Sequence, residues 1–111
     1  MQTVKALGER VVTVSARIPR SQLRELERLA EARGVDKSSV VRSLLDVGIR
    51  ETRLREALDL VRERKVSVWR AARMAGIDYR EMLAALRVHN VPFPLSAREL
   101  KRELDELSRN Q

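Results

Sequence analysis

Cysteine is absent from this 111-residue chain, and no apolar run approaches the length of a membrane span. Without cysteine the chain forms neither disulfide bonds nor thiolate metal sites, so nothing in it marks an oxidising compartment. A membrane-spanning helix needs roughly 20 apolar residues, and the N-terminus also lacks the apolar centre of a signal peptide. The sequence therefore predicts a cytoplasmic protein.

Residues suited to catalysis are also scarce. The chain has one histidine, His89, and three aromatic residues, Trp69, Tyr79 and Phe93. It has no glycine-rich phosphate loop and no His, Asp and Glu set at the spacing of a metal site. We therefore expect a protein that is not an enzyme and that uses no cofactor and no metal. His89 is expected to cap or pack at a helix end, and Trp69 and Tyr79 are expected to pack.

Basic residues outnumber acidic ones. The chain carries 23 Lys and Arg against 16 Asp and Glu, a formal net charge of +7. Basic side chains release counterions from phosphates, so double-stranded DNA is the first partner to consider. The alternative is the Arg- and Glu-rich surface of a thermophilic protein. The length allows one ordinary domain or two very small ones, which favours a binding module.

The N-terminal part contains one strand-like segment. Residues 1–10 have no clear period, and we expect a flexible arm there. Apolar and polar side chains alternate over residues 11–18, which predicts a β-strand. A lone strand leaves its backbone N–H and C=O groups unpaired, and no neighbouring segment has a strand pattern. The simplest mate is the same segment of a second copy, antiparallel across a two-fold axis.

Pairing of this kind would give a homodimer with an intermolecular two-stranded ribbon. Its apolar face would cover the helices, and its polar face would present Thr13, Ser15 and Arg17. Such a ribbon fits the major groove of B-DNA, where Arg17 suits a bidentate contact with guanine. The hydroxyls of Thr13 and Ser15 accept several base edges and specify less sharply. The alternative is a strand face that is merely solvated.

Two helices are expected after the strand. Pro19 suits the first turn of the first helix, and Gly34 is a typical stop. Asp36 is a good N-cap for the second helix. Its apolar face continues past Gly48, so residues 37–64 form either one helix or two.

The stretch VVTVSARIPRSQLRELERLAEARGVDKSSVVRSLLDVGI resembles ribbon-helix-helix repressors of the MetJ/Arc type. The resemblance covers less than half of the chain and implies a dimerisation and DNA-binding domain over residues 11–52. It implies base contacts by Thr13, Ser15 and Arg17, and phosphate contacts by Lys37, Ser38 and Ser39 at a helix N-terminus. Asp36 departs from the Ser or Thr of many relatives, and its negative charge opposes a close phosphate.

Residues 53–111 have the ingredients of a helix-turn-helix. Ser67 caps a short Ala-rich helix that stops at Gly76, and Asp78 with Glu81 forms a capping box for the next helix. The expected fold class is therefore mainly α: a ribbon-helix-helix followed by a small helical module. A second basic surface is expected from Arg64, Lys65, Arg70, Arg73, Arg80 and Arg87. These residues suit phosphates or an acidic protein partner, and a plain solvated face is the alternative.

A last helix follows the two proline residues at positions 92 and 94. Ser96 with Glu99 repeats the capping pattern before it. The helix carries Leu100, Leu104 and Leu107 among charges. We expect these leucines either to close the second module or to contact a partner.

The stretch VSVWRAARMAGIDYREMLAALRVHNVPFP looks like a family of small prokaryotic proteins of uncharacterised type, often described as antitoxins encoded beside PIN-like nucleases. Two functions are therefore open. One is a homodimeric, sequence-specific transcriptional regulator. The other is an antitoxin that autoregulates its operon and neutralises a toxin nuclease through its C-terminal module. A third possibility is an architectural chromatin protein with little sequence preference.

Overall fold

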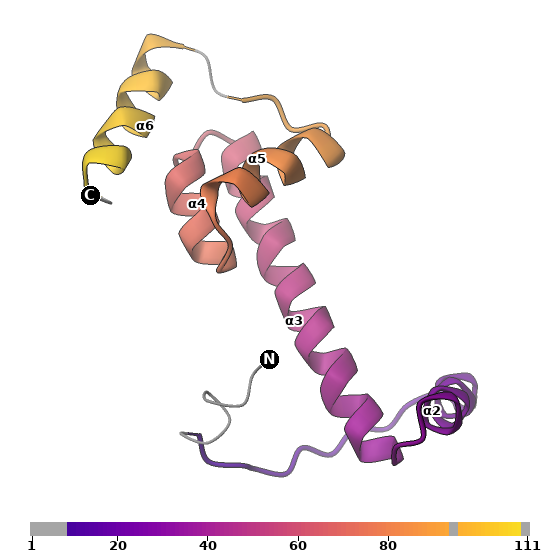
Figure 1. Cartoon of the computed structure of the whole chain (residues 1–111). Helices are drawn as coiled ribbons and strands as arrows, with labels where there is room; N and C mark the ends of the chain where they lie inside the picture. The colour runs from indigo at the N-terminus through magenta and orange to yellow at the C-terminus, as the bar shows by residue number, and fades with distance from the viewer. Residues whose placement is uncertain (1–8, 94–95, 110–111) are drawn as a thin grey trace. The chain divides into compact units, whose positions relative to one another are not determined.

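The computed structural model describes residues 9–93 and 96–109, and all regular structure within them is helical (Figure 1). The helices are α2 (Arg20–Arg33), α3 (Lys37–Arg62), α4 (Val68–Ala75), α5 (Tyr79–Val88) and α6 (Ala97–Arg109). The chain divides into two compact units, unit 1 over Met1–Val40 and unit 2 over Val41–Gln111. Helix α3 begins in unit 1 and continues into unit 2.

The predicted β-ribbon is wrong, and with it the ribbon-helix-helix fold class. Residues 11–19 have no regular secondary structure, and no strand occurs in the described part of the chain. A strand exists only through hydrogen bonds to a neighbouring strand, and no described segment supplies them. The alternation of apolar and polar residues in this segment also did not lead to burial of its apolar side chains: Val12 and Val14 are 76% and 83% exposed. The predicted arm lies mostly outside the described residues.

The capping signals of unit 1 were predicted correctly. Pro19 precedes α2, and its carbonyl accepts the N–H of Leu23 at 3.2 Å. Gly34 ends the helix with φ 67°, in the left-handed region that glycine adopts without a steric cost. Asp36 caps α3, since its carboxylate accepts the Ser39 N–H at 2.8 Å. The buried hydrophobic residues described in unit 1 are Ala30 and Val40.

The sequence left open whether residues 37–64 form one helix or two, and the structure of α3 decides between these alternatives. Its 26 residues form one continuous helix. Gly48 lies in its interior, where glycine costs about 1 kcal/mol relative to alanine without breaking the helix. The helix ends where Arg64 takes a φ of 60°, and the Lys65 N–H closes the turn on the Leu60 carbonyl at 2.8 Å.

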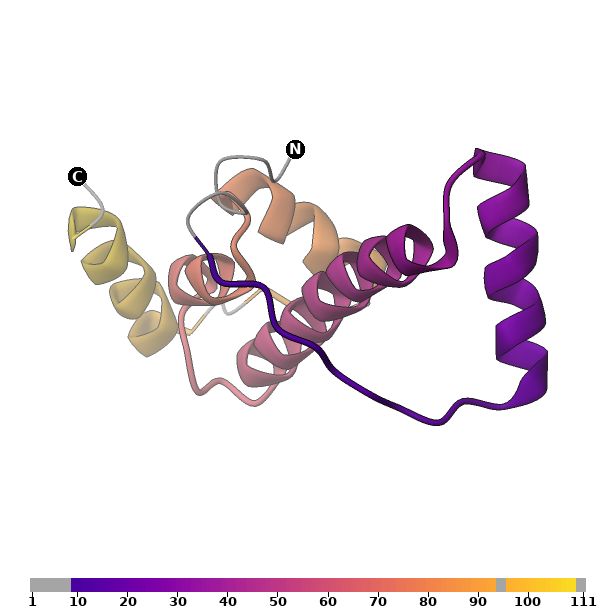
Figure 2. The same ribbon diagram turned by 90° about the horizontal axis from the view of Figure 1, so that it is seen from below.

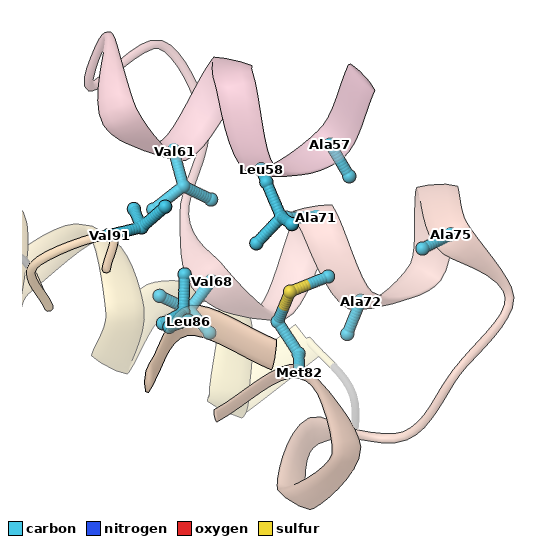
Figure 3. Packing of buried hydrophobic residues seen from close by; sticks show 10 residues of the cluster. All are labelled: Ala57, Leu58, Val61, Val68, Ala71, Ala72, Ala75, Met82, Leu86 and Val91. Carbon is cyan, nitrogen blue, oxygen red and sulfur yellow. The ribbon is translucent and has the colours of Figure 1, made fainter. Parts of the chain in front are cut away.

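The core of unit 2 forms between the C-terminal part of α3, helices α4 and α5, and the segment after α5 (Figure 3). Its buried members are Ala57, Leu58, Val61, Val68, Ala71, Ala72, Ala75, Met82, Leu86 and Val91. The alanines of α4 lack bulk beyond Cβ, which lets the neighbouring helices approach closely. Both ribbon views place α4 between α6 and the end of α3 (Figure 2). Helix α4 therefore has neighbours on several sides.

Within residues 9–93 and 96–109, no helix has the length and apolarity that a membrane span requires.

Candidate nucleic-acid interface

Helices α4 and α5 are joined by a tight, well-capped turn, and residues 67–88 are called the helix-turn-helix module below. Gly76 has φ 72°, and its N–H donates to the Arg73 carbonyl at 3.1 Å. Asp78 and Glu81 form the predicted capping box, in which each carboxylate accepts the other residue's backbone N–H, at 2.7 and 3.0 Å. A short glycine turn between two capped helices is the geometry that this motif needs.

The start of α4 has its backbone donors fully used. Ser67 caps the helix as predicted, and its Oγ accepts the Arg70 N–H at 3.0 Å. The N–H groups of Val68 and Trp69 donate to the two carboxylate oxygens of Glu103, at 2.6 and 3.4 Å. A side chain from α6 thus occupies the positive end of α4.

The six predicted basic residues fall into two sets. Arg64, Lys65 and Arg73 form ion pairs with Glu99, Glu63 and Glu106, at 3.1, 3.2 and 3.2 Å. Arg70, Arg80 and Arg87 are exposed. These three make no side-chain hydrogen bond or ion pair with any residue that the structure describes. The second set is therefore the charge available to a ligand.

Helix α6 turns an acidic face toward α4, which sequence reasoning missed. Glu99, Glu103 and Glu106 are 5%, 6% and 5% exposed. Their spacing of four and three residues places them on one side of a helix, a signal that is visible in the sequence. Leu100 and Leu104 lie on the adjacent side and are exposed, whereas the sequence left open whether the leucines of this helix close the module or contact a partner.

Two carboxyl groups of this face, those of Glu99 and Glu103, have pKa values that are shifted in opposite directions. The Ser96 hydroxyl donates to Glu99 at 2.8 Å and lowers the pKa of that carboxyl. Burial raises the pKa of Glu103, although the backbone donors of Val68 and Trp69 oppose the effect. Burial also raises the pKa of Tyr79, and the negative charge of Glu103 adds to it.

The residues predicted to read bases lie in the irregular segment before α2. Thr13, Ser15 and Arg17 are all exposed. Their assignment depended on a paired ribbon, and the described residues contain no strand. The sequence thus predicted correctly that these residues are exposed, but they do not lie on one strand face as expected.

The predicted phosphate contacts lie at the start of α3. Lys37 forms an ion pair with Glu27 of α2 at 3.7 Å, with both side chains about half exposed. Ser38 is exposed, while the Ser39 N–H is used by the Asp36 cap. The role of these three residues at a phosphate stays a prediction.

The part of α3 that opens unit 2 carries an exposed apolar face. Leu44, Leu45 and Ile49 are 40%, 55% and 50% exposed. Together with Gly48, Thr52 and Arg53 they line a shallow hollow of about 330 Å³. A Cβ added at Gly48 would meet nothing within 4 Å, so the hollow is open there.

Comparison with known proteins identifies the family. The sequence profile of the uncharacterised protein family UPF0175 matches residues 46–109, more than half of the chain. A UPF0175 protein of Archaeoglobus fulgidus is 40% identical over 55 residues, which are 50% of this chain and 63% of that protein. The match thus spans less than two thirds of the relative. No solved structure matches the chain.

The chain therefore belongs to the UPF0175 family. The matched residues include most of α3 and all of α4 to α6. They leave out almost all of the stretch that resembles ribbon-helix-helix repressors, so the comparisons give that resemblance no support.

Proposed function

We propose that this member of the UPF0175 family is a DNA-binding transcriptional regulator that acts as a homodimer and contacts DNA through its helix-turn-helix module. The observation that carries the proposal is the set of exposed cations on that module, Arg70, Arg80 and Arg87, which pair with no described residue. The excess of positive charge in the whole chain supports it.

The geometry of the motif assigns roles to these arginines. In a helix-turn-helix the second helix enters the major groove with its N-terminal residues toward the bases, and the first helix crosses the phosphate backbone. Arg80 is the second residue of α5 and is therefore the candidate for a base contact. Arg87 lies seven residues later on the same side of α5, and Arg70 lies on α4, so both suit phosphates.

Dimerisation is proposed from the apolar face of α3. Contiguous exposed apolar side chains are typical of surfaces that a partner covers. Gly48 has no side chain, and the exposed Leu44 and Ile49 flank it, an arrangement that suits the close approach of another helix. A second copy of the chain is the simplest partner, because a two-fold contact needs only one self-complementary surface.

Selection of bound fragments from the source genome tests this proposal. The expected result is a consensus with two related half-sites, since a two-fold protein selects a two-fold target. Recovery of fragments without any common sequence would contradict sequence-specific regulation and would favour an architectural role. Absence of DNA binding at low salt would contradict the proposal as a whole.

A second candidate function has one specific observation in its favour. Leu100 and Leu104 lie one helical turn apart on α6 and are 43% and 62% exposed. An apolar pair on a helix suits a groove on a protein partner, as an antitoxin requires. Co-purification of a nuclease, released by Leu100→Lys together with Leu104→Lys, would favour this function over a regulator acting alone.

A further inference from the structure

Helix α6 is bound to the helix-turn-helix module by the side that would be expected to face water. Among the side chains of α6 that the structure describes, the buried ones are Glu99, Glu103 and Glu106, whereas Leu100 and Leu104 are exposed. Amphipathic helices of soluble proteins normally bury the apolar side. The contact with α4 is therefore built from charge rather than from apolar packing.

Each buried glutamate binds a positive group of the module or of the turn before it. Glu103 accepts the N–H groups of Val68 and Trp69 at the start of α4. Glu106 pairs with Arg73 of α4 at 3.2 Å. Glu99 pairs with Arg64, which follows α3, at 3.1 Å.

Two of these positive groups, the α4 N-terminus and Arg73, belong to the first helix of the module. The first helix of the motif crosses the DNA backbone, and helix N-termini and arginines are the usual phosphate ligands. The carboxylates of Glu103 and Glu106 therefore bind groups of a kind that also binds phosphate oxygens.

The contact is also suited to release. Taking a carboxylate out of water costs free energy that its new partners offset only in part. Leu100 and Leu104 contribute little to this contact because they remain exposed. A helix held in this way is more easily displaced than one that buries an apolar face.

We propose that α6 is an autoinhibitory helix, whose acidic face covers the phosphate-facing side of the helix-turn-helix module and leaves it when DNA binds. The inference rests on the proposed DNA-binding function and adds a regulatory step to it. The group that α6 covers is the α4 N-terminus, and Arg73, whose side chain is 47% exposed, is held by α6 in an ion pair with Glu106.

Charge reversal within the full chain tests the proposal. In Glu103→Lys an ammonium group faces the positive end of α4, so α6 is expected to leave it. The matched control is Asp105→Lys, which makes the same change of charge at an exposed position of α6. Affinity for a short random-sequence DNA duplex is measured by fluorescence anisotropy at fixed salt, because both variants gain the same non-specific attraction.

We expect Glu103→Lys to bind the duplex about tenfold more tightly than Asp105→Lys, within the usual range of coupling between two sites. Equal affinities of the two variants, with clear binding by both, would overturn autoinhibition and leave the DNA-binding function intact. If wild type and both variants fail to bind DNA, the proposed function fails and the autoinhibition fails with it.

A second variant keeps the test valid if Glu103→Lys does not fold, which circular dichroism would reveal. Glu106→Lys places a cation against Arg73 at the other end of the contact. It should also bind more tightly than Asp105→Lys. Equal affinity of Glu106→Lys and Asp105→Lys would overturn the proposal in the same way.

Discussion

Trp69, the second residue of α4, stacks on Tyr79, the first residue of α5, with ring centroids 4.1 Å apart and ring planes 16° from parallel. Both side chains are half-buried, in agreement with the packing role expected from the sequence. The stack joins the starts of two helices that the chain connects only through the turn after α4. It therefore fixes how α5 is presented relative to α4.

Loss of this stack should destabilise the module. Trp69→Ala removes a large half-buried ring and an aromatic pair, so we expect the free energy of unfolding to fall by about 2 kcal/mol. Urea denaturation followed by circular dichroism measures the change. Val88→Ala is the control, since Val88 is 76% exposed and should matter little. Equal losses in the two variants would contradict a structural role for the stack.

Arg80 should contribute to DNA recognition. If it contacts a base, Arg80→Ala should weaken binding to the selected sequence by ~1–3 kcal/mol and weaken binding to random DNA far less. Arg50→Ala on α3 removes the same charge from an exposed residue outside the module. Electrophoretic mobility shifts with both duplexes measure the two affinities. If both variants lose the same affinity for the selected sequence, Arg80 contributes only non-specific electrostatic attraction to DNA.

The apolar face of α3 should control the oligomeric state. Leu44→Lys places a charge beside Gly48, in the centre of the proposed dimer contact, and burial of that charge would be costly. Light scattering after size exclusion should show the mass of a monomer for this variant and of a dimer for wild type. Val88→Lys makes a comparable change at an exposed apolar residue of α5 and should leave the mass unchanged. A monomeric wild-type protein would refute dimerisation.

The attachment of α6 should depend on pH through Glu103. Burial raises the pKa of this carboxyl above its ordinary value of 4.5, so the folded state holds the proton more tightly than the unfolded state. The resulting stability is complete below the ordinary value and is lost as the pH rises through the folded pKa. Glu99 acts in the opposite sense, because its pKa is lowered and its contribution is lost on acidification.

Thermal melting of Glu103→Gln against wild type isolates the first effect. The groups around Glu103 are Arg102 and Glu106 on α6 and Tyr79 on α5, and all remain in the variant. The melting temperature of Glu103→Gln minus that of wild type should be larger at neutral pH than at a pH below 4.5, the ordinary pKa of a glutamate. Asp105→Asn, on the exposed side of α6, should show no such trend. A constant difference at every pH would contradict the assignment to Glu103.

Local signals in the sequence located the helices well. Gly34 and Gly76 end α2 and α4 in the left-handed conformation, and Asp36, Ser67 and Asp78 cap the helices that follow them. Each signal involves residues within one or two helical turns. Such interactions are decided by neighbours along the chain, which is why the sequence alone was sufficient.

The strand at residues 11–18 failed for the opposite reason. Its alternation is genuine, yet a strand also needs a partner at a distance in the chain, and no local pattern guarantees one. The absence of information about distant contacts also explains why the sequence left open whether α3 is one helix or two. Neither Gly48 nor the charges after it decided whether the helix continued, because the packing of Leu58 and Val61 in the core of unit 2 stabilises its second half.

The sequence by itself determined most of the helix caps, the family and the basic character of the chain, since these follow from residue types and short spacings. Only the tertiary structure decided which side of each helix is covered. In α6 the pattern offered a leucine side and a glutamate side, and the glutamates became buried because α4 presents backbone donors and Arg73 to them. Burial of a charged group depends on partners far away in the chain, and those partners meet only after folding.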